Sequence, residues 1–189
     1  MNKRGKLIVI VAPSGTGKSS LIEKVMEKTP SLKWSVSCTT RPIREGEEHE
    51  KDYFFMPEAD FLNKKDNDEL IEWAKVHSNY YGTSKQFVED GLDNGENLLF
   101  DLDVQGCDSM KKVFGDEANV IFIEPPSVEE LEKRLLNRAT DSADVIKERV
   151  NNAKKELLRK DDYDFKVTND NFDTALQNLI NVINSILAE

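Results

Sequence analysis

The residues of this chain with the clearest chemistry lie in the short segment Gly15-Thr16-Gly17-Lys18-Ser19. An apolar run at 7–11 precedes the segment, and a helical pattern of apolar residues at 21–26 follows it. A strand, a glycine loop and a helix in that order present backbone N–H groups and the positive end of a helix dipole to a phosphate chain. In such a loop Lys18 neutralises the outer phosphates and Ser19 ligates Mg²⁺. The alternative is a chance glycine turn, and Ala12 stands where the strict pattern has glycine.

A second group of residues could hold another phosphate. Arg41 and Arg44 lie in a loop rich in turn residues, and Tyr53 and Tyr81 follow in two aromatic segments. Forked guanidinium donors and phenol hydroxyls suit a phosphate monoester. Two loop arginines considered alone are more simply a solvated pair, so this interpretation depends on the glycine loop.

One carboxylate stands where a metal site is expected. Asp101 ends the apolar run that begins at Asn97, and enzymes with a phosphate loop keep a carboxylate for Mg²⁺ at the end of such a strand. Asp103 competes for the same role, and an Asp that merely ends a strand is the alternative.

A third group combines carboxylates with hydroxyls. A guanine edge offers donors at N1 and N2 and acceptors at O6 and N7, so a site that selects guanine needs both kinds of group. Ser37, Glu72, Thr83 and Asp103 supply them. The signal from composition alone is weak, because this chain has 36 acidic residues.

Arg138 and Arg149 flank a polar break between two helical patterns. Around a mobile segment they could fold over donor phosphates and stabilise charge as a lid closes. The alternative is that they are surface residues of helices, paired with Asp141 and Glu148.

Composition bounds the class of protein. A chain of 189 residues can bury one good core with a small inserted lobe, and its formal net charge of −10 opposes binding to a long nucleic acid. No apolar run is long enough to cross a bilayer, so no membrane association is expected.

The two cysteines, Cys38 and Cys107, lack metal-ligand spacing, which predicts reduced thiols, no zinc and a cytoplasmic location. His49 and His77 have no partner pattern and are expected to be structural or exposed.

The pattern of apolar residues predicts an α/β fold with three layers around a central parallel sheet. Strands are expected at 7–11, 34–37, 53–55, 97–101, 119–123 and 165–167, and helices after the loop, after Pro57, over 128–136, over 145–158 and at the C-terminus. Residues 79–84 read as a polar, aromatic turn. The expected organisation is one domain over 1–189, with a core of 1–33, 91–137 and 150–189, a small inserted α+β acceptor-binding lobe at 34–90 and a mobile lid at 138–149.

Several motifs together resemble guanylate kinase, a nucleoside monophosphate kinase of the P-loop type. They are PSGTGKS, SVSCTTRPIREGE, DYFF, IEWA, NYYGTS, LDVQG, the RAT and ER segments of 138–149, and VTND. The resemblance runs from about residue 6 to 188, and the stretch with two arginines is its strongest marker. The departures are Ala12, Cys38 and Ala139, none of which removes a charge. Altered lid flexibility is the most that we expect from them.

The resemblance implies transfer of a phosphoryl group from ATP to GMP with Mg²⁺, in purine nucleotide metabolism. It assigns to ATP the residues Ala12, Pro13, Ser14, Gly15, Thr16, Gly17, Lys18, Ser19, Ser20, Arg138 and Asn169. It assigns to GMP the residues Ser37, Arg41, Arg44, Tyr53, Glu72, Tyr81, Thr83 and Asp103. Catalysis is expected from Lys18, Arg41, Arg44, Arg138 and Arg149, and metal binding from Ser19 and Asp101. The expected assembly is a monomer or a homodimer.

Two alternative functions remain at this point. A kinase for another nucleoside monophosphate would share the loop and the lid but not the base-binding residues. A non-catalytic guanylate-kinase-like module would bind phosphopeptides around Arg41, Arg44 and Tyr53, although such modules usually lose the phosphate loop that this chain retains.

Overall fold

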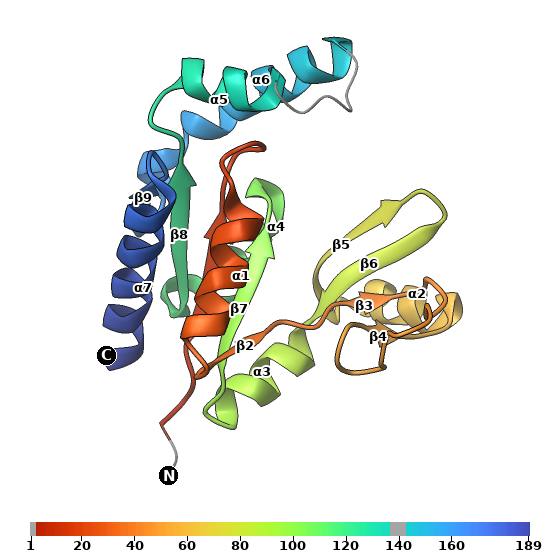
Figure 1. The fold of residues 1–189 in the computed structure, drawn as a ribbon. Helices are drawn as coiled ribbons and strands as arrows, with labels where there is room; N and C mark the ends of the chain where they lie inside the picture. Colours follow the sequence, from red (N-terminus) through yellow and green to blue (C-terminus); the bar gives the residue numbers. More distant parts are fainter. Residues whose placement is uncertain (1–2, 137–142) are drawn as a thin grey trace.

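The structure, a computed structural model, describes residues 3–136 and 143–189, and within them two sheets (Figure 1). The larger sheet has the strand order β2-β7-β1-β8-β9, and all of its pairings are parallel. Its strands are β2 (Leu32–Trp34), β7 (Asn97–Leu102), β1 (Leu7–Val11), β8 (Ala118–Glu124) and β9 (Phe165–Thr168). The parallel sheet and the strands at 7–11, 97–101, 119–123 and 165–167 confirm the sequence-based prediction.

Helices cover both faces of this sheet, as its continuous apolar strands require. Leu7, Val9 and Val11 of β1 pack in the same cluster as residues of α3 (Lys85–Asp93) and α4 (Val104–Phe114). Ile8 and Ile10 point to the opposite face, where they join α1 (Lys18–Lys28) and α7 (Phe172–Ala188). Alternate residues of one strand therefore fill two cores, and the result is three layers.

The smaller sheet projects from the side of the larger one (Figure 1). Its order is β4-β3-β6-β5, with β4 (Phe54–Phe55), β3 (Cys38–Thr39), β6 (Asn79–Ser84) and β5 (Leu70–Val76), and α2 (Glu58–Asp66) packs against it through Phe61. This sheet and α2 lie within the inserted lobe predicted at 34–90, whereas α3 crosses the predicted boundary and ends at Asp93.

Two predictions of local structure in this lobe need correction, a turn and a strand. Residues 79–84 were expected to form a turn, but they form β6, antiparallel to β5. Gly82 suits the strand because a Cβ there would lie 2.7 Å from the carbonyl oxygen of Glu72, so glycine permits close approach of β5. The turn itself is at His77, which has a φ of 54° without being glycine. The strand expected at 34–37 ends at Trp34, and β3 begins only at Cys38.

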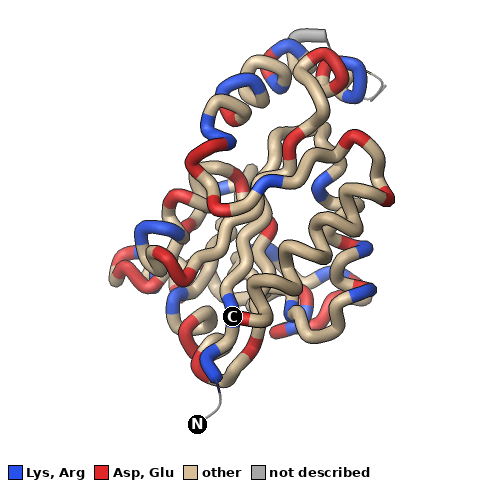
Figure 2. The backbone as a smooth tube through the Cα atoms, turned by 90° about the vertical axis from the view of Figure 1, so that its left-hand side faces the viewer, with Lys and Arg blue, Asp and Glu red and all other residues tan. Residues whose placement is uncertain are grey.

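Two helices lie above the carboxyl ends of the core strands (Figure 1). They are α5 (Val128–Leu136) and α6 (Ala143–Leu157), which pack together through Leu131, Leu135 and Ala153. The Ser127 hydroxyl accepts a hydrogen bond of 3.1 Å from the backbone N–H of Glu130 and so caps the start of α5. Lys and Arg are interspersed with Asp and Glu along both helices (Figure 2). Two short 3₁₀ turns, Gly115–Glu117 and Lys160–Asp162, complete the described elements, and none of the described helices is long and apolar enough to cross a membrane.

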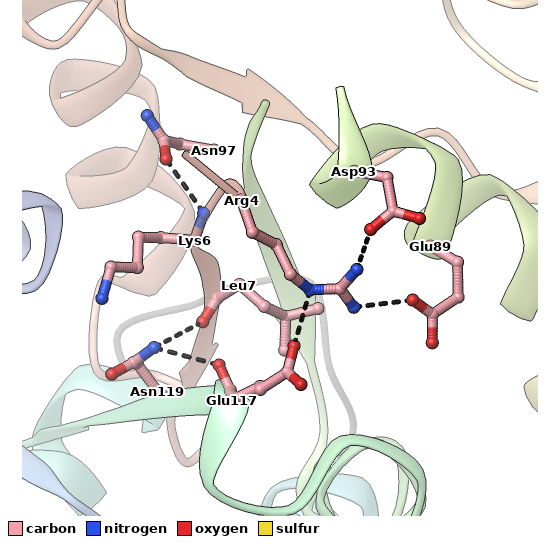
Figure 3. Close-up of polar contacts among 8 residues, drawn as sticks. All are labelled: Arg4, Lys6, Leu7, Glu89, Asp93, Asn97, Glu117 and Asn119. Atoms are coloured by element: carbon pink, nitrogen blue, oxygen red, sulfur yellow. Dashed lines mark hydrogen bonds and ion pairs between the residues drawn. The ribbon is translucent and has the colours of Figure 1, made fainter. Parts of the chain in front are cut away.

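Polar side chains connect several segments at the other end of the larger sheet, where its central strands begin (Figure 3). Arg4 donates to Glu89 at 2.6 Å, to Glu117 at 3.0 Å and to Asp93, and so ties the segment before β1 to α3 and to the turn before β8. Nearby, Asn119 donates to the carbonyl oxygens of Leu7 and Glu117. These contacts hold the strand that leads into the glycine loop.

Candidate nucleotide-binding site

The glycine loop connects β1 to α1 and has the backbone that its sequence predicts. Gly15 and Gly17 have φ angles of 91° and 84°, a region that side chains disfavour. Between them Thr16 is 1% exposed, and its hydroxyl donates to the carbonyl oxygen of Pro13 at 2.9 Å. The loop therefore closes on itself and leaves the first N–H groups of α1 pointing into it.

Distant segments hold the loop in place. The side-chain amide of Asn169, which is 5% exposed, donates to the carbonyl oxygen of Thr16 at 2.7 Å. A Cβ on Gly15 would lie 2.9 Å from a methyl carbon of Leu135 on α5, and one on Gly17 would lie 2.9 Å from the Asn169 amide nitrogen. The two glycines thus meet both a backbone and a packing requirement.

Lys18 lies at the start of α1 and points toward β7. Its ammonium group donates to the carbonyl oxygen of Leu102 at 3.0 Å and forms an ion pair with Asp101. Parallel strands end at the same edge of a sheet, and for this reason Lys18 after β1 and Asp101 near the end of β7 can meet.

The loop lines a cavity of about 360 Å³. Its walls are Ala12, Pro13, Ser14, Gly15, Thr16, Gly17, Lys18, Ser19, Ser20, Asp103 and Glu156. All nine predicted loop residues therefore face one space. Asp103 reaches it as the N-cap of α4, where its carboxylate accepts a bond of 2.7 Å from the backbone N–H of Gly106.

A second cavity, of about 210 Å³, lies between β7 and the smaller sheet. It is lined by Trp34, Ser35, Ser37, Asp52, Tyr53, Thr83, Phe100, Asp101 and Leu102. Three residues predicted to bind an acceptor, Ser37, Tyr53 and Thr83, thus come together there. Asp101, predicted as a metal ligand, lines this cavity, while Asp103, predicted as an acceptor residue, lines the loop cavity.

Arg41 is positioned by an acidic partner and by aromatic rings. Its guanidinium group makes two hydrogen bonds to Glu47, of 3.0 and 2.8 Å, and lies 5.4 Å from the centre of the Tyr53 ring. The hydrogen bonds to Glu47 raise the pKa of Arg41, and a further hydrogen bond to Tyr81 acts in the same direction. Glu47 also accepts from the backbone N–H of Arg44 at 2.8 Å. One carboxylate therefore organises the loop that carries both predicted phosphate-binding arginines.

Glu72 and Thr83 face each other across β5 and β6. They are register partners, and the Thr83 hydroxyl donates to the Glu72 carboxylate at 2.6 Å. A register shift between Leu70 and Glu72 marks a bulge that sets this pairing. Burial raises the pKa of Glu72; the hydrogen bond from Thr83 opposes the shift, and the charge of Asp103 adds to it. Asp103 lines the loop cavity, so its charge connects that cavity with the Glu72 carboxylate of the smaller sheet.

The remaining predicted residues are placed as follows. Tyr53 and Tyr81 pack edge to face with ring centres 6.0 Å apart. Arg44 is exposed, Arg149 lies on α6, and Arg138 is outside the described residues. Cys38 and Cys107 are buried free thiols whose pKa is raised to about 11 by that burial.

Three further residues, Glu47, Arg134 and Glu156, shape the site without having been predicted from the sequence. Glu47 lies inside the quoted two-arginine motif, where an acid six residues after Arg41 was the available signal. Arg134 of α5 donates to the carbonyl oxygen of Asn169 at 3.0 Å. Glu156 lines the loop cavity from α6, and nothing in the sequence distinguished it from the other acidic residues of that helix.

Comparison with known proteins agrees with this arrangement. The family model described as guanylate kinase matches residues 4–186. The guanylate kinase of Buchnera aphidicola is 46% identical, over 95% of this chain and 87% of its own length. That of Thermotoga maritima is 41% identical, over 96% and 87%.

Solved structures give the same result. The crystal structure of guanylate kinase from Anaplasma phagocytophilum superposes with a TM-score of 0.70 at 29% identity, covering 100% of this chain and 89% of that one. A gluconokinase from Sinorhizobium meliloti, with a TM-score of 0.51 at 12% identity, shares the fold alone. One cavity is lined by the glycine loop, the other by residues predicted to bind an acceptor, and the relatives match nearly the whole chain. Together these findings lead to one conclusion: the chain belongs to the guanylate kinase family.

Proposed function

We propose that this kinase transfers the γ-phosphoryl group of ATP to the phosphate of GMP, with ATP in the loop cavity and GMP in the cavity between β7 and the smaller sheet. The observation that carries this proposal is the ion pair of Lys18 and Asp101. Lys18 lines the first cavity and Asp101 lines the second, so the two cavities meet at that pair. A phosphoryl group needs only a short path between substrates held there.

No general base is needed for this reaction. The second pKa of a phosphate monoester is about 6, so GMP is largely a dianion at neutral pH and can attack in line. The obstacle is repulsion between two polyanions. We assign its relief to Lys18 and to the arginines at 41, 44, 138 and 149.

The acceptor base is selected by Glu72 and its neighbours. The Glu72 carboxylate can accept from N1–H and N2–H of guanine, while Thr83, held at 2.6 Å from it, fixes its orientation. Ser37 completes the edge from the same cavity as Thr83, whereas Asp103, predicted for the same role, lines the loop cavity. An adenine has no matching pair of donors on its ring edge, which supports GMP over AMP.

Mg²⁺ belongs to the proposal as the partner of ATP. The described residues contain no group of three acidic, His or Cys side chains that could hold a metal alone. This fits an ion held mainly by nucleotide phosphates and water, with Ser19 and Asp101 as the protein oxygens. When bound, the ion neutralises phosphate charge. We further propose a cytoplasmic enzyme, monomeric or homodimeric, that acts on free nucleotides.

The test is a coupled assay of ADP release with GMP, dGMP, AMP, CMP and UMP as acceptors. GMP should be the preferred acceptor, and dGMP should follow because the base carries the recognition. Preference for AMP would contradict the assignment of Glu72. Absence of transfer to every monophosphate, combined with binding of a phosphopeptide, would instead favour the non-catalytic module.

The matched variant for this assay is Glu72→Gln, which keeps the shape of the side chain. It should raise the KM for GMP about tenfold or more, because one acceptor of two guanine donors becomes an amide. The KM for ATP should stay at its wild-type value.

A further inference from the structure

Glu156 is a half-buried carboxylate that the proposed reaction does not use. It lies on α6 and lines the loop cavity together with Lys18 and Asp103. Burial raises its pKa; the positive charge of Lys18 opposes that shift, and the negative charge of Asp103 adds to it. The carboxylate is thus close enough to both groups to interact with them across the space that we assign to ATP phosphates.

The charges around this cavity are unusual for a polyanion site. Among the described residues that line it, Lys18 is the one cation, and Asp103 and Glu156 are two anions. Lys18 is already paired with Asp101, which removes part of its charge from the cavity. Backbone N–H groups of the loop and the dipole of α1 attract phosphate, but the fixed carboxylates oppose it.

A divalent cation changes this balance. ATP without a metal carries about four negative charges, and the two carboxylates repel it at short range in a partly desolvated space. Mg²⁺ halves the charge of the nucleotide and is also attracted to the carboxylates, directly or through its water molecules. A carboxylate that is destabilised by burial and by a like charge gains more from a nearby cation than an exposed one does.

We propose that Glu156 is a specificity-determining residue that makes this site favour the Mg²⁺ complex of ATP over the metal-free nucleotide. The inference rests on the proposed placement of ATP in the loop cavity. Glu156 acts through charge: it disfavours the metal-free tetraanion and stabilises the hydrated ion on the bound complex. No bond is made or broken in this role.

Glu156 also lies seven residues after Arg149 on the same helix, which places the two on one face two turns apart. Helix α6 therefore carries both Arg149, a predicted catalytic residue, and the Glu156 carboxylate.

The test measures binding of a non-hydrolysable ATP analogue by calorimetry, once with Mg²⁺ and once with EDTA. The quantity of interest is the ratio of the two dissociation constants. In Glu156→Gln we expect the preference for the metal complex to fall about tenfold, because the metal-free analogue binds more tightly and the complex binds no better. Glu156→Asp, which keeps the charge, should retain most of the preference.

The control is Glu23→Gln, which removes one negative charge from the exposed side of α1 without touching the cavity. Its ratio should equal that of wild type, and thermal unfolding of each variant confirms that it is folded. A Glu156→Gln protein that is folded and keeps the wild-type ratio would overturn this inference alone. A wild-type protein that fails to bind the analogue even with Mg²⁺ would overturn the proposed donor site as well.

Discussion

The two halves of the proposed site are held by different kinds of interaction. The donor loop is fixed by burial: β1 is fully buried, Thr16 is 1% exposed, and Leu135 fills the space beside Gly15. The acceptor side has a small core of Cys38, Phe61 and Leu70, and its functional groups are set by polar pairs such as Arg41 with Glu47. The donor half is therefore rigid by packing, whereas the acceptor half can rearrange its contacts when a substrate enters.

The largest expected effect is a loss of turnover when a charge is removed from the donor half. Lys18→Met should reduce turnover on the order of 10²-fold or more, because the ammonium group stabilises charge that develops in the transition state. GMP binding, measured by calorimetry, should remain nearly normal. Lys24→Met, on the exposed part of the same helix, is the control, and its turnover should match wild type. Wild-type turnover in Lys18→Met would contradict the assignment of the donor half.

The next effect is a loss of stability that should be accompanied by weaker binding of ATP but not of GMP. Asn169→Ala removes a buried donor to the carbonyl oxygen of Thr16 and should lower the free energy of unfolding by about 1–3 kcal/mol. The KM for ATP should rise because the loop is released, while the KM for GMP should not change. Asn171→Ala, which removes the cap of α7, is a comparison variant that loses stability without touching the loop. Equal changes in both KM values of Asn169→Ala would show that the halves are not separately held.

In the acceptor half, a substitution should weaken substrate binding with little effect on stability. Glu47→Gln breaks the paired hydrogen bonds to Arg41, and we expect the KM for GMP to rise about tenfold because the arginine is no longer positioned. Chemical denaturation should detect only a small change, because glutamine fills the same partly buried space and keeps one side-chain oxygen as an acceptor for Arg41. Glu45→Gln makes the same charge change on a neighbouring exposed residue and should leave the KM for GMP unaltered. A large loss of stability in Glu47→Gln would contradict the contrast between packed and polar halves.

The smallest expected effect is a gradual dependence of guanine affinity on pH. Because burial raises the pKa of Glu72, the ionised form that accepts from guanine is lost at a higher pH than for an ordinary glutamate. Affinity is therefore full above the raised pKa and weakens as the pH falls through it. Guanosine is the suitable ligand, because it lacks the phosphate that titrates near pH 6. Calorimetry over a pH series should show this step in wild type and not in Glu72→Gln; the same step in both proteins would assign it to another group.

The same contrast explains what the sequence made predictable. The strand, loop and helix around Lys18 form one continuous segment, and their periodicity and glycines predict the local structure directly. Strand β6 was missed because its hairpin turns at His77 and Ser78, which lack the usual Asn-Gly or Asp-Gly signal, while Gly82 falsely suggested a turn. Patterns along the chain predict local elements better than contacts between them.

Contacts between segments far apart in the sequence account for the remaining differences. Asp101 and Asp103 are two residues apart on the chain, yet they line different cavities, and no periodicity indicates which cavity each one faces. Glu156 is 138 positions away from Lys18, and in an acid-rich chain its type carries no signal. Three-dimensional structure was needed to bring these charges together.

The edge of the sheet fastened by Arg4 has a consequence for how the chain could be rearranged. Lys6 forms an ion pair of 4.0 Å with Glu189, so the segment just before β1 and the carboxyl-terminal end of α7 lie close together, far from the glycine loop (Figure 1). A short flexible linker could join these ends, and new termini could open elsewhere, for example in the exposed turn at His77. Such a permuted chain would keep both cavities and place its new ends in the hairpin of β5 and β6, so that an attached fluorophore would lie on the sheet that holds Glu72 and Thr83.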